Sequence, residues 1–180
     1  MAEAGTHIFR VALRDRPSVH RDIEIDSGKS LAKLAEAIVR AFDFEFDHAF
    51  GFYPDTKSRA VMRGRPAYEL FADMGEAAGT QSVRKTRIGD AFREVGQAMT
   101  FLFDYGDEWL FRVEVIALRR RESKARYPRV LAKAGPSPAQ YPDPEDEEDE
   151  DGASRALPAC RGERDRRGRA LRPPAALTGA

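Results

Sequence analysis

The residues best placed to do chemistry surround one turn of the chain, and three of them are acids: Asp104, Asp107 and Glu108. Gly106 supplies the turn, and Trp109, the chain's one tryptophan, follows it. Carboxylate oxygens in this arrangement could bind a hard cation such as Mg²⁺, with His48 as a nearby base. In the structural alternative, the aspartates accept backbone amides around Gly106 and the indole packs on a sheet. The residue pattern favours this second interpretation.

Clustered carboxylates raise one another's pKa unless a cation lies close by, and Arg21 or Arg112 could supply that charge. We therefore predict that any ligand site lies between this turn, His48 and Arg21. The sequence has no phosphate-binding loop, nucleophile elbow, zinc-ligand spacing or dinucleotide fingerprint. We predict no catalytic residue, metal ligand or cofactor, and a non-enzymatic function over an enzymatic one.

A second candidate site is a run of basic residues near position 120. These cations could follow the phosphates of a nucleic acid. They lack the interleaved aromatic residues of a single-strand binding surface. The run comprises Arg119, Arg120, Arg121, Lys124, Arg126 and Arg129.

Alternating apolar residues predict the strands that hold these groups. The clearest strands cover residues 6–14, 21–26, 49–53, 101–105 and 109–118, with a short strand at 68–71. Ile23 and Ile25 point inward on the second strand. Residues 75–82 read as a loop.

Helical spacing of apolar residues predicts a main helix over 30–42 and a short helix over 87–95. Ser27 or Ser30 is expected to cap the main helix by accepting a hydrogen bond from its first free amides. Burial of its four large apolar side chains would contribute roughly 6–12 kcal/mol before entropy. These side chains are Leu31, Leu34, Ile38 and Phe42.

The fold is therefore predicted to be α+β, with an antiparallel-dominated mixed sheet of about five strands. It opens with a ββαβ unit. We expect one folded domain over residues 6–142. Residues 143–180 form an acidic and then Arg/Pro-rich tail that lacks the apolar surface needed to fold, and we predict that it is disordered.

Composition gives the broad class of the chain. It has 180 residues, a formal net charge of zero and a single cysteine, Cys160, so an internal disulfide or a cysteine-based metal cluster is excluded. The first residues lack the pattern of a secretory signal, and no apolar run approaches the roughly 20 residues of a membrane span. We expect a cytoplasmic protein that does not bind membranes.

The aromatic strand, the turn 103–109 (Phe-Asp-Tyr-Gly-Asp-Glu-Trp) and the alternating strand after it resemble the plasmid pRi ORF-three-like family. Members of this family are also found as passenger proteins of an insertion element. The resemblance covers about residues 6–142 and includes the opening hairpin, the helix with His48 and Phe50 after it, and the segment 127–142. Relatives often have a histidine near Leu110 or Phe111, and both residues are apolar here.

The resemblance implies no established biochemical activity. We predict an interaction or accessory domain whose partner is a protein, with a link to plasmid or mobile-element biology. One alternative is a nucleic-acid-associated regulator that uses the basic segment 119–129. The other is a metal-assisted enzyme built on Asp104, Asp107 and Glu108.

Overall fold

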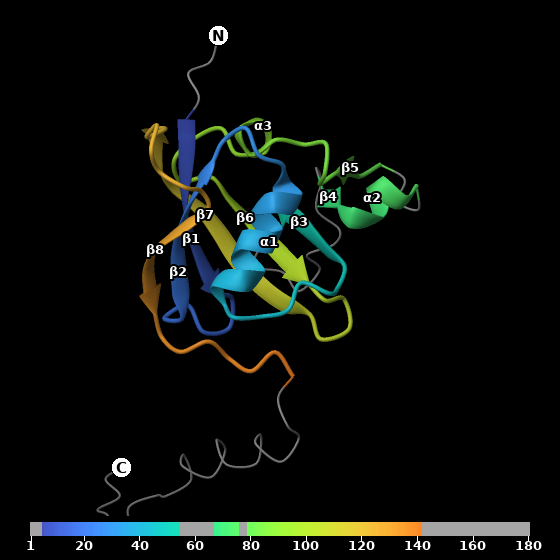
Figure 1. Ribbon diagram of the computed structural model, residues 1–180. Coiled ribbons are helices and arrows are strands. Elements are labelled where there is room, and N and C mark those ends of the chain that lie inside the picture. Colours follow the sequence, from blue (N-terminus) through green and yellow to red (C-terminus); the bar gives the residue numbers. More distant parts are fainter. Residues whose placement is uncertain (1–4, 55–66, 76–78, 142–180) are drawn as a thin grey trace, which may run out of the picture. The chain divides into compact units, whose positions relative to one another are not determined.

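The computed structural model describes residues 5–54, 67–75 and 79–141 (Figure 1). The predicted tail over 143–180 lies outside the described residues, and the predicted domain limits stay a prediction. The elements follow one another along the chain as β1 (Gly5–Leu13), β2 (His20–Asp26), α1 (Leu31–Ala41), β3 (Phe50–Pro54), β4 (Tyr68–Glu69), α2 (Leu70–Met74), β5 (Gln81–Ser82), α3 (Ile88–Ala91), β6 (Ala98–Phe103), β7 (Trp109–Arg120) and β8 (Arg129–Ala134).

These strands form one sheet in the order β5-β4-β3-β6-β7-β1-β2-β8. Every neighbouring pair is antiparallel except β4 and β5, which are parallel. The α+β class, the ββαβ opening and the antiparallel-dominated mixed sheet are confirmed. The prediction of about five strands is wrong, because the sheet has eight.

The strands that the sequence did not reveal lack a readable alternation. β4 covers the first half of the predicted short strand 68–71, so that strand was found. β5 contains two residues, which is too short for a period of two to be visible. β5 falls in the predicted loop 75–82, and α2 replaces the second half of the predicted strand 68–71. β8 is a sheet edge whose Val130 and Leu131 are exposed, so its apolar residues do not mark a buried face.

Helix α1 lies across one face of the sheet (Figure 1). Its four large apolar side chains are 0% exposed, as the helical spacing predicted. They share one hydrophobic core with inward-facing side chains of β1, β6 and β7, including Phe9, Val11, Phe101 and Val113. Because β1 is separated in sequence from β6 and β7, α1 holds the two halves of the chain together.

The predicted serine cap of α1 is wrong. Ser30 occupies the N-cap position, but its side chain makes no capping hydrogen bond. The first helical amides instead donate to carbonyl groups of the segment before α3, Leu31 N–H to Thr86 O at 3.0 Å and Ala32 N–H to Val83 O at 2.9 Å. Segment 83–87 therefore fixes the beginning of α1.

The predicted helix 87–95 is shorter than expected, because the backbone is already extended at Phe92. The Phe92 ring packs edge-on against Phe9, with ring centroids 4.9 Å apart. Continuing the helix would move this ring out of the core, so tertiary packing ends it.

The opposite face of β7, β1 and β2 carries charge pairs. Arg10 on β1 donates from Nε and Nη2 to the two carboxylate oxygens of Asp22 on β2, each at 2.9 Å. Glu114 on β7 lies opposite Arg10, so charges alternate across three strands. No helix within the described ranges is long and apolar enough to cross a membrane.

Candidate functional site

The turn between β6 and β7 is a hydrogen-bonded corner built on Asp104. Its Oδ1 accepts the Gly106 N–H at 2.9 Å, and its carbonyl accepts the Glu108 N–H at 2.8 Å. Its own N–H donates to Ala49 O at 3.0 Å, which ties the corner to the start of β3. Asp104 and Glu108 adopt positive φ angles of 58° and 51°, so these two residues, and not Gly106, take the left-handed conformation of the turn. Aspartate tolerates that conformation because its short side chain bonds locally.

His48 lies against this corner, between two carboxylates. Its Nδ1 is 2.7 Å from Oδ1 of Asp47, and its Nε2 is 3.3 Å from Oδ2 of Asp104. The hydrogen bond with Asp47, with Asp104 and Asp107 adding their charges, raises the pKa of His48. A higher pKa favours the imidazolium, which cannot accept a proton. The arrangement therefore resembles an ion pair more than a general base.

The three turn acids do not converge. Asp104 is buried, whereas Asp107 and Glu108 are exposed. Within the described ranges, no group of three or more His, Cys, Asp or Glu side chains is arranged to hold a metal ion. At Asp104 the corner matches the structural alternative of backbone capping, whereas Asp107 is exposed; as a ligand site the corner stays a prediction.

Trp109 anchors the corner to the loop after α1. Its ring packs edge-on against Phe44 with centroids 4.8 Å apart, and Phe44 in turn contacts Phe111. The indole Nε1 is buried and has no hydrogen-bond acceptor among the described residues. Packing, rather than hydrogen bonding, therefore holds this side chain.

Arg21 binds a different set of groups, all outside the turn. It lies on β2, is 2% exposed and has its guanidinium over the ring of Phe42 at 4.7 Å. Nε donates to Ala41 O at the end of α1, at 3.0 Å. Nη1 donates to the carbonyls of His20, Ala134 and Gly135, at 2.9, 2.8 and 3.1 Å. Nη2 donates to the Ser137 hydroxyl at 2.8 Å.

The segment after β8, residues 135–140, is held by this arginine and by two further contacts. Ser137 donates to Asp43 Oδ2 at 2.8 Å, and the Gln140 side chain accepts the Glu45 N–H at 2.7 Å. The same segment thus runs from Arg21 to the loop that carries Asp47 and His48. Arg21 therefore has a structural role, because it links β2 to the end of α1 and to the segment after β8. The structure does not bring it together with the turn acids.

The basic segment is interrupted by carboxylates. Arg121 Nε lies 3.2 Å from Asp26 Oδ2. Arg129 Nη2 lies 2.7 Å from Glu24 Oε2 and 3.1 Å from Glu122 Oε1. Lys124 and Arg126 are exposed, as are Arg119 and Arg120. At least two of the six predicted phosphate-binding residues, Arg121 and Arg129, are therefore already engaged with acids.

A serine–histidine pair that the sequence did not suggest lies at the other end of β1. His7 is 5% exposed; its Nε2 donates to Phe92 O at 2.8 Å, so its Nδ1 accepts from the Ser27 hydroxyl at 2.8 Å. Burial, partly offset by the bond to Phe92, lowers the pKa of His7. A nucleophilic serine needs free N–H groups nearby, which stabilise the oxyanion that forms on the substrate during the reaction. The closest amides, of Gly28 and Gly89, already donate to Asp26 Oδ1 and Ser27 O.

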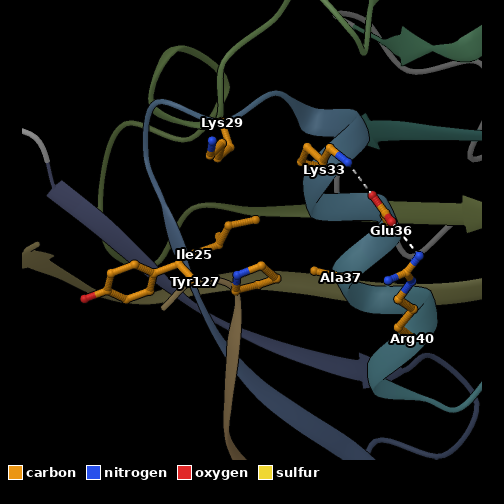
Figure 2. A pocket seen from close by; sticks show the side chains of 8 residues that line it. Ile25, Lys29, Lys33, Glu36, Ala37, Arg40 and Tyr127 are labelled. Atoms are coloured by element: carbon orange, nitrogen blue, oxygen red, sulfur yellow. Dashed lines mark hydrogen bonds and ion pairs between the residues drawn. The ribbon is translucent and has the colours of Figure 1, made fainter. Parts of the chain in front are cut away.

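A groove beside α1 is the other feature that sequence reasoning missed. It encloses about 290 Å³, and Figure 2 shows Lys33, Glu36 and Arg40 along the helix wall with Ile25 and Tyr127 across from them. Lys33 and Arg40 have a spacing that places them on one side of α1, which is a readable signal, whereas Lys29 lies in the turn before the helix. The opposite wall could not be predicted, because it comes from Tyr127 and Pro128, far along the chain.

This α+β architecture, with its aromatic corner, was compared with known proteins. The chain belongs to the family described as plasmid pRiA4b ORF-3-like protein, whose model matches residues 6–172. A crystal structure of a protein of unknown function from Methanosarcina mazei has a similar fold, with a TM-score of 0.59, 18% sequence identity, and coverage of 75% of this chain and 74% of that chain. No protein with a curated description matches significantly.

We predict that Arg21→Met destabilises the protein by about 3 kcal/mol or more, because buried carbonyl groups lose a charged donor. The free energy of unfolding in urea measures this loss. Arg10→Met is the matched control, since the Arg10 side chain is 47% exposed and its pair with Asp22 should contribute about 1 kcal/mol or less. Equal effects of the two substitutions would contradict the structural role of Arg21.

We also predict opposite pH effects of two histidines. The lowered pKa of His7 means that the unfolded chain binds the proton better, so its contribution to stability is complete above pH 6.5 and is lost as the pH falls towards the folded pKa. The raised pKa of His48 gives a contribution that is complete below pH 6.5 and is lost as the pH rises through its folded pKa.

The free energy of unfolding, measured from mildly acidic to mildly basic pH, separates these effects. His7→Gln should flatten the loss of stability towards acid, whereas His48→Gln should steepen it. The same pH dependence in both variants and in the wild type would show that neither histidine is perturbed in this way.

Proposed function

We propose that this domain is a non-catalytic interaction module and that the groove beside α1 is its contact surface. The observation that carries the proposal is the make-up of the groove. Apolar groups form its floor, while Lys29, Lys33 and Arg40 stand at its rim. Binding surfaces commonly combine an apolar centre with charged groups around it.

The groups that could perform catalysis have structural partners instead. Asp104 caps a backbone amide, and His48 is held between two carboxylates. Ser27 and His7 contact one another, but the amides beside them are already bonded. These commitments favour binding over a metal-assisted reaction at the turn.

The nucleic-acid alternative would use the basic segment 119–129. The ion pairs of Arg121 and Arg129 with Asp26, Glu24 and Glu122 weaken it, because a phosphate would have to displace carboxylates. Exposed Lys124 and Arg126 are the positions at which this alternative can be tested.

The family description supports a role in plasmid or mobile-element biology. On this proposal the module is an accessory component that binds another protein in the cytoplasm. The match to the family supports a role in plasmid or mobile-element biology, and the groove supports binding to another protein as the way the domain acts.

Capture of partners by the purified full chain tests the proposal. Lys29→Glu/Lys33→Glu reverses the rim of the groove and should remove the bound proteins. His48→Gln at the corner should leave them bound. Both variants must be folded at the assay temperature, as checked by circular dichroism, and the captured proteins are compared by quantitative mass spectrometry with and without nuclease treatment.

The third variant, Lys124→Glu/Arg126→Glu, reverses the same number of charges in the basic segment. Loss of partners in this variant and on nuclease treatment would support the nucleic-acid alternative. Loss in His48→Gln would move the site to the corner, and in either case the groove proposal would fail.

A further inference from the structure

We propose that the groove beside α1 binds an acidic amphipathic peptide segment of the partner protein. Carboxylates of the peptide would contact the basic rim, and its apolar side chains would lie on the floor. This inference rests on the proposed function and specifies the chemistry of the partner.

The basic rim suits an elongated anion. Lys33 and Arg40 lie seven residues apart on α1, which corresponds to roughly 10 Å along the helix, and Lys29 continues the rim in the turn before the helix. The Lys33 and Arg40 side chains are 64% and 72% exposed, so both can reach an incoming carboxylate. Lys29 is exposed as well and makes no ion pair within the described ranges.

Glu36 is the one acid that lines the groove, and it organises the two cations beside it. Its carboxylate lies 2.8 Å from Lys33 Nζ and 2.7 Å from Arg40 Nη2, as the dashed lines in Figure 2 mark. The hydrogen bond from Lys33 is the main cause of a lowered pKa of Glu36, which therefore stays ionised. Three cations and one carboxylate leave two positive charges facing the groove.

The floor suits apolar side chains. Ile25 is buried, and Ala37 faces the groove from α1 with a side chain small enough to leave room beside it. Pro128 is exposed, and Val130, which pairs with buried Ile23, is 41% exposed on the neighbouring strand. Covering Pro128 and Val130 would remove apolar surface from water, which an anion without apolar parts cannot do.

A peptide matches these features better than a nucleic acid. Arg129 already lies over the Tyr127 ring, 5.3 Å from its centroid, so this ring is partly occupied as a stacking surface for a base. The Glu36 carboxylate at the middle of the rim can accept a backbone N–H of a peptide, a donor that a phosphodiester backbone lacks.

The groove also matches this occupant better than strand addition at the edge of the sheet. β8 has a bulge against β2 and carries exposed Lys133, two features that protect sheet edges from added strands. The partner should therefore contact side chains of α1 rather than extend the sheet.

Selection from a random phage-displayed peptide library on the full-length chain tests the inference. We expect enriched peptides that combine Asp or Glu with apolar residues. Their affinity, measured as synthetic peptides by fluorescence anisotropy, should fall about tenfold or more in Lys29→Glu/Lys33→Glu and on raising the salt concentration. Lys124→Glu/Arg126→Glu is the matched control and should bind as the wild type does.

A second variant, Ala37→Gln, places a longer side chain in the groove without changing its charge and should also weaken binding. Enriched peptides that bind the groove variants more weakly but contain no acidic residues would overturn the inference that the partner segment is acidic. The proposed function would then still stand. Peptides that bind both groove variants normally, or no enrichment at all, would overturn the inference. An oligonucleotide that binds in their place, with the same dependence on Lys29 and Lys33, would overturn it in favour of nucleic acid.

Discussion

The structure depends most on one buried cation, the guanidinium of Arg21. This group joins β2 to the last residue of α1 and to the segment after β8, and it stands over the ring of Phe42. Its acceptors come from three separate parts of the chain, so the arginine fixes where α1 ends on the sheet. The beginning of the helix is fixed by the carbonyls of Thr86 and Val83. With both ends held, α1 presents a rigid wall to the groove, which is a condition for a preformed binding surface.

The acidic corner illustrates how residues typical of catalysis can serve structure. Asp104 satisfies amides in a turn whose left-handed positions are taken by residues other than glycine, and His48 compensates its charge. Trp109 then ties the corner to the aromatic core through Phe44. Groups available for binding lie elsewhere, on the exposed side of α1. This separation is the physical basis for the proposed binding function.

Sequence patterns predicted the elements whose burial alternates, namely β1, β2, α1 and the β6–β7 hairpin. They located β4 but not its end, and they failed for β5 and β8, because pairing with neighbouring strands, rather than local sequence, creates these elements. The inward position of Arg21 was readable in principle, since it shares the alternation of Ile23 and Ile25. Its partners were not, because Ala134 and Ser137 lie more than a hundred residues away. The groove was hidden for the same reason: its walls meet only in the folded chain.

The most direct test of the central claim, that binding occurs beside α1 and not at the acidic corner, is hydrogen–deuterium exchange of the full-length chain with and without a saturating captured partner. We expect slower exchange over residues 25–40 and 127–130. We expect no change over 45–48 and 104–109. Protection confined to the latter two segments would contradict the account and return the site to His48 and Asp104.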